Sequence, residues 1–161
     1  MVEQDTIKLL RECDAGIKMG VKSIHDVYDH VKSNKMRECL NACKDEHDEL
    51  DKELQQLLGK YHDEGKDPNP MAKGMSWMKT TMKLGMDDSD NTIADLMTDG
   101  CDMGIKSLNR YLNEYKAADE VAKEICKRLI KLEEKLRKQM QEYLKKKQQG
   151  FRTDHVRKYF M

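Results

Sequence analysis

Apolar residues recur at spacings of three and four along most of the chain, the pattern of helices that bury one face. Two such segments lie within residues 4–62 and two within residues 91–149. We therefore expect four helices of about 26 to 30 residues each. The expected inward positions are Leu10, Asp14, Ile17, Val21, Ile24, Tyr28 and Val31, then Leu40, Cys43, His47, Leu50, Leu54, Leu57 and Tyr61, then Ala94, Thr98, Cys101, Ile105, Leu108, Leu112 and Tyr115, and finally Cys126, Leu129, Glu133, Leu136, Met140 and Tyr143.

Residues with N-cap chemistry stand where these helices should begin. Ser33 and Asp119 precede the second and fourth helices. Both are suitable N-caps, because their side-chain oxygens can accept a hydrogen bond from the first turn. The third helix should begin at about residues 89–91, where Thr92 and Asp95 have the spacing of a capping box. Short turns are therefore expected inside each pair of helices.

The chain also repeats itself at an offset of about 84 to 86 residues. Residues 19–24, MGVKSI, recur as residues 103–108, MGIKSL. Residues 50–58 align less closely with residues 136–144. Each copy is long enough for two helices, so the repeat predicts two similar helical hairpins joined by a long connection.

Together these patterns predict an all-α fold, an antiparallel four-helix bundle with a short crossover helix. Pro occurs only at positions 68 and 70, and helix-forming residues dominate the composition. The expected organisation is one domain over residues 1–150, with hairpins at about 4–62 and 91–149, a crossover at about 63–90, and a C-terminal tail at 151–161.

Charge, hydropathy and cysteine content indicate where the protein is expected to act. The 30 basic residues balance the 30 acidic ones, so no electrostatic case for nucleic acid exists. No apolar run approaches the roughly 20 residues of a transmembrane helix, and the first residues, MVEQD, have neither the basic nor the apolar region expected of a signal peptide. Five cysteines without a Cys-x-x-Cys motif favour reduced thiols. Cys39, Cys43 and His47 share one helix flank and could in principle chelate a soft metal, but a straight helix spreads them over about 12 Å, which disfavours a shared ion. We expect a cytoplasmic protein.

Four polar residues interrupt the inward apolar positions, one in each helix: Asp14, His47, Thr98 and Glu133. A buried polar group without a partner costs about 1–3 kcal/mol, so each should be satisfied inside the bundle. One interpretation is a core histidine bonded to Asp14 or Glu133, with Thr98 bonded to its own helix backbone. Another is a polar site with a chemical role.

The layout resembles the ferritin-like superfamily over about residues 4–149, and most closely its small bacterial stress-protein families of uncharacterised function. The resemblance rests on the repeated hairpins, the long crossover and the interior polar positions 33 to 35 residues apart. In metal-binding members, two helices each contribute a Glu and two contribute Glu-x-x-His. The resemblance therefore implies a helical bundle whose interior can hold metal.

This chain departs from that ligand pattern, since both motif histidines are leucines. The resemblance therefore implies a family member without a complete di-iron centre. At the two single-Glu positions stand Asp14 and Thr98, and at the two motifs stand His47-x-x-Leu50 and Glu133-x-x-Leu136.

The favoured hypothesis is a non-catalytic binding or structural protein that self-associates as a homodimer or larger homo-oligomer, without a cofactor. The alternative is a single Fe, Mn or Zn ion held by Asp14, His47 and Glu133, with Thr98 or water completing the shell. Acid–base catalysis by the same three residues stays open, so enzymatic activity is undecided.

Two segments could contact a partner. The crossover carries a methionine stripe including Met75, Met78 and Met82, beside Trp77. These side chains either pack over the bundle or form a surface for a second subunit or a partner helix. Lysines at 145–147 and Gly150 would end the fourth helix. The basic, aromatic tail beyond it either folds back or docks another chain.

Overall fold

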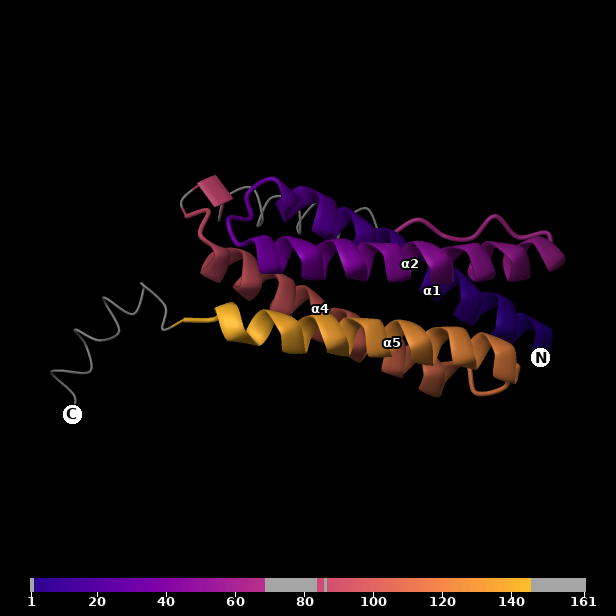
Figure 1. Ribbon diagram of the computed structural model, residues 1–161. Coiled ribbons are helices and arrows are strands. Elements are labelled where there is room, and N and C mark those ends of the chain that lie inside the picture. Colours follow the sequence, from indigo (N-terminus) through magenta and orange to yellow (C-terminus); the bar gives the residue numbers. More distant parts are fainter. Residues whose placement is uncertain (1, 69–83, 86, 146–161) are drawn as a thin grey trace, which may run out of the picture.

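The computed structural model describes residues 2–68, 84–85 and 87–145 of the 161 (Figure 1). The described residues form four α-helices and one short 3-10 helix, and they contain no β-strand. The fold is therefore all-helical, as the periodicity predicts. The helices are α1 (Val2–Tyr28), α2 (Asn34–Lys60), α4 (Asp90–Glu114) and α5 (Glu120–Met140), followed by the 3-10 helix η1 (Gln141–Tyr143).

The four helices pack as a bundle. Helix α1 contacts both α2 and α4, and α5 contacts the same two helices. Figure 1 shows α2 and α5 lengthwise beside one another, and α1 also reaches α5 across the interior. Residues 29–33 join α1 to α2, and residues 115–119 join α4 to α5. Every helix therefore contributes side chains to a common interior.

Each short loop is bonded to the beginning of a helix from the other pair. In the first loop, the backbone N–H groups of Lys32 and Ser33 donate to the Asp90 carboxylate at 2.8 and 2.9 Å. In the second, Asp119 N–H donates to Thr6 Oγ1 at 2.8 Å. These bonds satisfy loop N–H groups that lie outside the backbone hydrogen-bond pattern of the helices.

The interior consists of two apolar clusters that follow one another along the helices. The first cluster includes Ile17, Leu50, Leu108 and Leu129, and the second includes Ile24, Cys43, Cys101 and Leu136. On every helix the two clusters are separated by less than two turns. The gaps on α1, α2, α4 and α5 include Gly20, His47, Gly104 and Glu133, respectively.

The predicted N-caps Ser33 and Asp119 are confirmed. Their side chains accept hydrogen bonds from Met36 N–H and Ala122 N–H, in the first turns of α2 and α5. The capping box expected at Thr92 is wrong. The cap of α4 is Ser89, whose hydroxyl accepts from Thr92 N–H at 3.2 Å, so Thr92 already lies inside the helix.

The fourth helix ends earlier than expected. Helix α5 stops at Met140, η1 continues to Tyr143, and Leu144 is extended with ψ of 122°. The backbone N–H of Lys145 then donates to Asn91 Oδ1 at 2.8 Å, at the beginning of α4. Because the chain leaves its helical path to make this contact, Gly150 is not the cap of α5. Gly150 itself lies outside the described residues.

Candidate polar site in the bundle interior

His47 and Glu133 meet between the two apolar clusters. His47 projects from α2 with 1% of its side chain exposed, and Glu133 projects from α5 with 12% exposed. The Nε2 atom of His47 lies 3.3 Å from Glu133 Oε1. Its Nδ1 atom lies 2.7 Å from the carbonyl oxygen of Cys43, one turn earlier on the same helix. Both ring nitrogens therefore face oxygen acceptors.

This arrangement fits a protonated ring. A neutral imidazole has one N–H donor, whereas an imidazolium has two and can bond both oxygens at once. Burial lowers the pKa of His47, but hydrogen bonds to Cys43 and Glu133 outweigh it and raise the pKa to about 10. We therefore describe the two side chains as a buried imidazolium–carboxylate pair.

Glycines make room for this pair. A Cβ atom on Gly20 of α1 would lie 2.9 Å from His47 Nε2, closer than carbon and nitrogen pack. A Cβ on Gly104 of α4 would lie 3.5 Å from Glu133 Oε2, an ordinary contact. Both glycines stand at the same place in the repeated MGVKSI and MGIKSL segments. The repeat was the signal for them, but sequence reasoning gave them no role.

Asp14 belongs to a different cluster of contacts. Its buried carboxylate accepts from Gln55 Nε2 and from the backbone N–H of Lys66, both at 2.9 Å, and pairs with Lys18 Nζ at 2.9 Å. Gln55 lies eight residues after His47 on α2, roughly 12 Å along the axis. Asp14 thus fastens the segment after α2 to α1.

The chain comes unusually close to Asp14 at Gly65. Gly65 has φ of 88°, in the left-handed region that favours glycine. A Cβ atom at this position would overlap the Asp14 carboxylate. Beside it, Lys66 Nζ pairs with Glu12. Gly65 therefore permits both the turn and the approach that lets Lys66 N–H reach Asp14.

Thr98 is buried and bonded to its own helix. Its hydroxyl lies 2.7 Å from the carbonyl oxygen of Ala94. Of the four polar residues singled out in the sequence, the structure brings together only His47 and Glu133, while Asp14 and Thr98 have other partners. Among the described residues, no group of three His, Cys, Asp or Glu side chains is arranged to hold a metal ion.

Two cysteines adjoin the pair. Cys43 Sγ lies 3.5 Å from His47 Nδ1. On α4, Cys101 lies beside Glu133, and burial together with that carboxylate raises the pKa of the Cys101 thiol. The pair is therefore flanked by thiols from α2 and α4. The spacing of four residues placed Cys43 and His47 on one helix flank, but no sequence pattern placed Cys101 beside Glu133.

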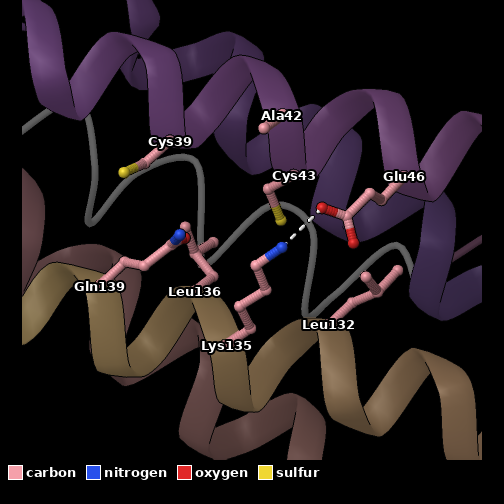
Figure 2. Close-up of a pocket in the computed structure, with 8 residues that line it drawn as sticks. All are labelled: Cys39, Ala42, Cys43, Glu46, Leu132, Lys135, Leu136 and Gln139. Carbon is pink, nitrogen blue, oxygen red and sulfur yellow. Dashed lines mark hydrogen bonds and ion pairs between the residues drawn. The ribbon is translucent and has the colours of Figure 1, made fainter.

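Cys43 also borders a small surface groove between α2 and α5 (Figure 2). Lys135 Nζ pairs with Glu46 Oε1 at 2.9 Å across this groove. Figure 2 shows the Cys43 sulfur pointing toward that ion pair, while the Cys39 sulfur points away along the groove. Cys43 therefore borders the groove and also contacts His47 of the interior pair.

The proposed partner residues Met75, Met78, Met82 and Trp77 lie outside the described residues, as does the tail at 151–161. Within the described part of the chain, every helix is too short or too polar to traverse a bilayer. No family model, curated protein or solved structure matches the chain.

Proposed function

We propose that this chain is a non-catalytic structural or binding protein with a ferritin-like, antiparallel bundle that lacks a complete di-iron site. The observation that carries the proposal is how the interior polar groups are satisfied. Asp14, His47, Thr98 and Glu133 all bond to other groups of the chain. Side chains already held by such bonds are poor candidates for ligands, because binding would leave buried partners unpaired.

The antiparallel layout is supported by the loop contacts. The loop between α4 and α5 bonds Thr6 near the start of α1, and the loop between α1 and α2 bonds Asp90 at the start of α4. Short loops join neighbours that run in opposite directions in four-helix bundles. The repeat and the interior polar positions add the resemblance to ferritin-like proteins.

Self-association is the second part of the proposal. The exposed large apolar residues among the described positions are single side chains such as Met103 and Val121, which is ordinary for a monomer. The proposal therefore depends on Met75, Met78, Met82 and Trp77, whose flexible thioethers and indole suit a contact surface.

Elemental analysis of protein purified without chelator tests the part of the proposal that denies a metal centre. We expect Fe, Mn and Zn well below one equivalent, with unchanged helicity after dialysis against EDTA. Near-stoichiometric metal that disappears in His47→Ala would overturn the proposal in favour of a single-ion site. Asp14→Asn is a second test of the single-ion site. A metal ion held by Asp14, His47 and Glu133 together would also be lost in that variant.

Light scattering after size exclusion tests self-association. We expect a mass of two or more chains, and a single-chain mass in a variant with Met75, Met78 and Met82 changed to Ser. The matched control is Met103→Ser, an exposed methionine on α4. A single-chain mass for the unmodified protein at all concentrations would contradict this part alone.

A further inference from the structure

Cys43, His47 and Glu133 form a continuous line of contacts. The Cys43 sulfur lies 3.5 Å from one ring nitrogen, and Glu133 Oε1 lies 3.3 Å from the other. This order of thiol, imidazole and carboxylate is the one that activates cysteine nucleophiles in unrelated proteins. The bonds to Cys43 O and Glu133 hold the ring in this orientation.

The thiol can be reached from the surface through the groove between α2 and α5. Cys43 is 5% exposed and borders the groove with Cys39 and Lys135. The Lys135–Glu46 pair across it is exposed, with 56% and 37% of the two side chains open to solvent. Exposed ion pairs contribute only about 0–1 kcal/mol, so this one can open without unfolding the bundle.

We propose that Cys43 is a covalent attachment site for small α,β-unsaturated carbonyl compounds. The narrow groove restricts the reagent to a few heavy atoms. The Lys135 ammonium lies in the groove, where it can donate to a carbonyl oxygen. A reactive double bond conjugated to a carbonyl therefore matches both the nucleophile and the donor that the groove presents.

The reaction is a conjugate addition. The thiol proton leaves to water in the groove, and the sulfur electron pair forms an S–C bond to the β-carbon. The π electrons of the C=C bond move toward the carbonyl oxygen, where the Lys135 ammonium faces the developing charge, and water returns a proton to the α-carbon. During attack, the Nδ1–H of His47 stays bonded to the Cys43 carbonyl oxygen, and the positive charge of the ring, 3.5 Å from the sulfur, stabilises the negative charge there. No oxidant and no leaving group are required.

The chain contains two matched internal controls. Cys39 borders the same groove without contacting the imidazole, so it reports exposure alone. Cys101 lies beside Glu133 but outside the groove, and it is 2% exposed. Labelling of Cys101 therefore reports unfolding or general opening of the bundle.

The experiment treats the full-length protein with acrolein and follows each cysteine by peptide mass spectrometry. We expect Cys43 to react faster than Cys39 although it is the more buried of the two, while Cys101 stays unmodified. In His47→Gln, Cys43 labelling should slow about tenfold or more, with Cys39 unchanged. A bulky maleimide should label Cys39 but not Cys43.

The proposal is overturned if Cys39 reacts while Cys43 remains as inert as Cys101, or if His47→Gln leaves the Cys43 rate unaltered. A variant that fails to fold will label Cys101 rapidly. In that event the comparison of Cys43, Cys39 and Cys101 in the unmodified protein decides, because it needs no substitution.

Discussion

Replacing Gly20 with Ala places a methyl group against the buried pair. The new Cβ atom would lie 2.9 Å from His47 Nε2 and 3.2 Å from its Cδ2. The ring cannot easily turn aside, since its Nδ1 atom is held 2.7 Å from the Cys43 carbonyl and the side chain is almost fully buried. The methyl group must therefore displace the ring from Glu133 or push α1 away from α2.

Two opposing effects set the size of the change. Alanine is favoured over glycine inside a helix by about 1 kcal/mol. Overpacking a core costs about 1–3 kcal/mol, and breaking a buried ion pair by removing one partner costs about 3–5 kcal/mol. Because Gly20→Ala weakens the pair without deleting it, we expect a net destabilisation of about 1–2 kcal/mol, or a melting temperature lower by about 2–8 °C.

Gly104→Ala is the matched control. It changes the corresponding glycine of the repeat, but its Cβ would meet Glu133 at 3.5 Å or more, an ordinary contact. We expect Gly104→Ala to be neutral or up to about 1 kcal/mol more stable.

Urea unfolding followed by far-ultraviolet circular dichroism measures both variants, with the slope checked for constancy. Gly20→Ala and Gly104→Ala with equal, raised stability would refute the described placement of the His47 ring.

Three further predictions follow from the same contacts. The folded pKa of His47, about 10, lies above its ordinary 6.5, so the stabilisation from the pair is complete below about pH 6.5 and is lost as pH rises toward 10. Urea unfolding across this range should show a steeper decline for the unmodified protein than for Glu133→Gln, and parallel profiles would contradict the pairing. Gly65→Ala should lower the free energy of unfolding by more than about 1 kcal/mol, because it strains the left-handed turn and collides with Asp14. Thermal melts test this against Gly59→Ala, whose Cβ meets nothing within 4 Å. Ser33→Ala should cost about 1 kcal/mol through loss of the bond to Met36 N–H, whereas Ser33→Asp should keep most of it; equal losses in both variants would refute the capping role.

Periodicity alone located the helices and the inward position of the pair. His47 and Glu133 each stand three or four residues from apolar inward neighbours, so helical geometry required them to face the interior. The caps Ser33 and Asp119 could also be predicted from the sequence, because an N-cap depends only on the local backbone and a single side chain. Contacts of this kind are encoded within one or two turns.

Asp14 shows why contacts between distant parts of the chain could not be predicted from the sequence. Its burial was predicted, but its partners include the backbone N–H of Lys66, 52 residues away, which depends on the path of a loop. The end of α5 likewise depends on Asn91, 54 residues from Lys145. Whether Asp14 lies near His47 depends on which turns of α1 and α2 are level with one another. Spacing along the sequence does not determine that alignment.

His47 and Glu133 are 86 residues apart, which matches the offset of the sequence repeat. His47 in the first half and Glu133 in the second therefore stand at corresponding positions. Opposite charge at such corresponding positions makes the halves complementary and unequal. A first half paired with another first half would oppose two imidazoliums in an apolar interior, and two second halves would oppose two carboxylates. Like charges there cost several kcal/mol, which disfavours both homotypic assemblies. One buried contact thus favours the pairing of α1 and α2 with α4 and α5 over the pairing of either set with a second copy of itself.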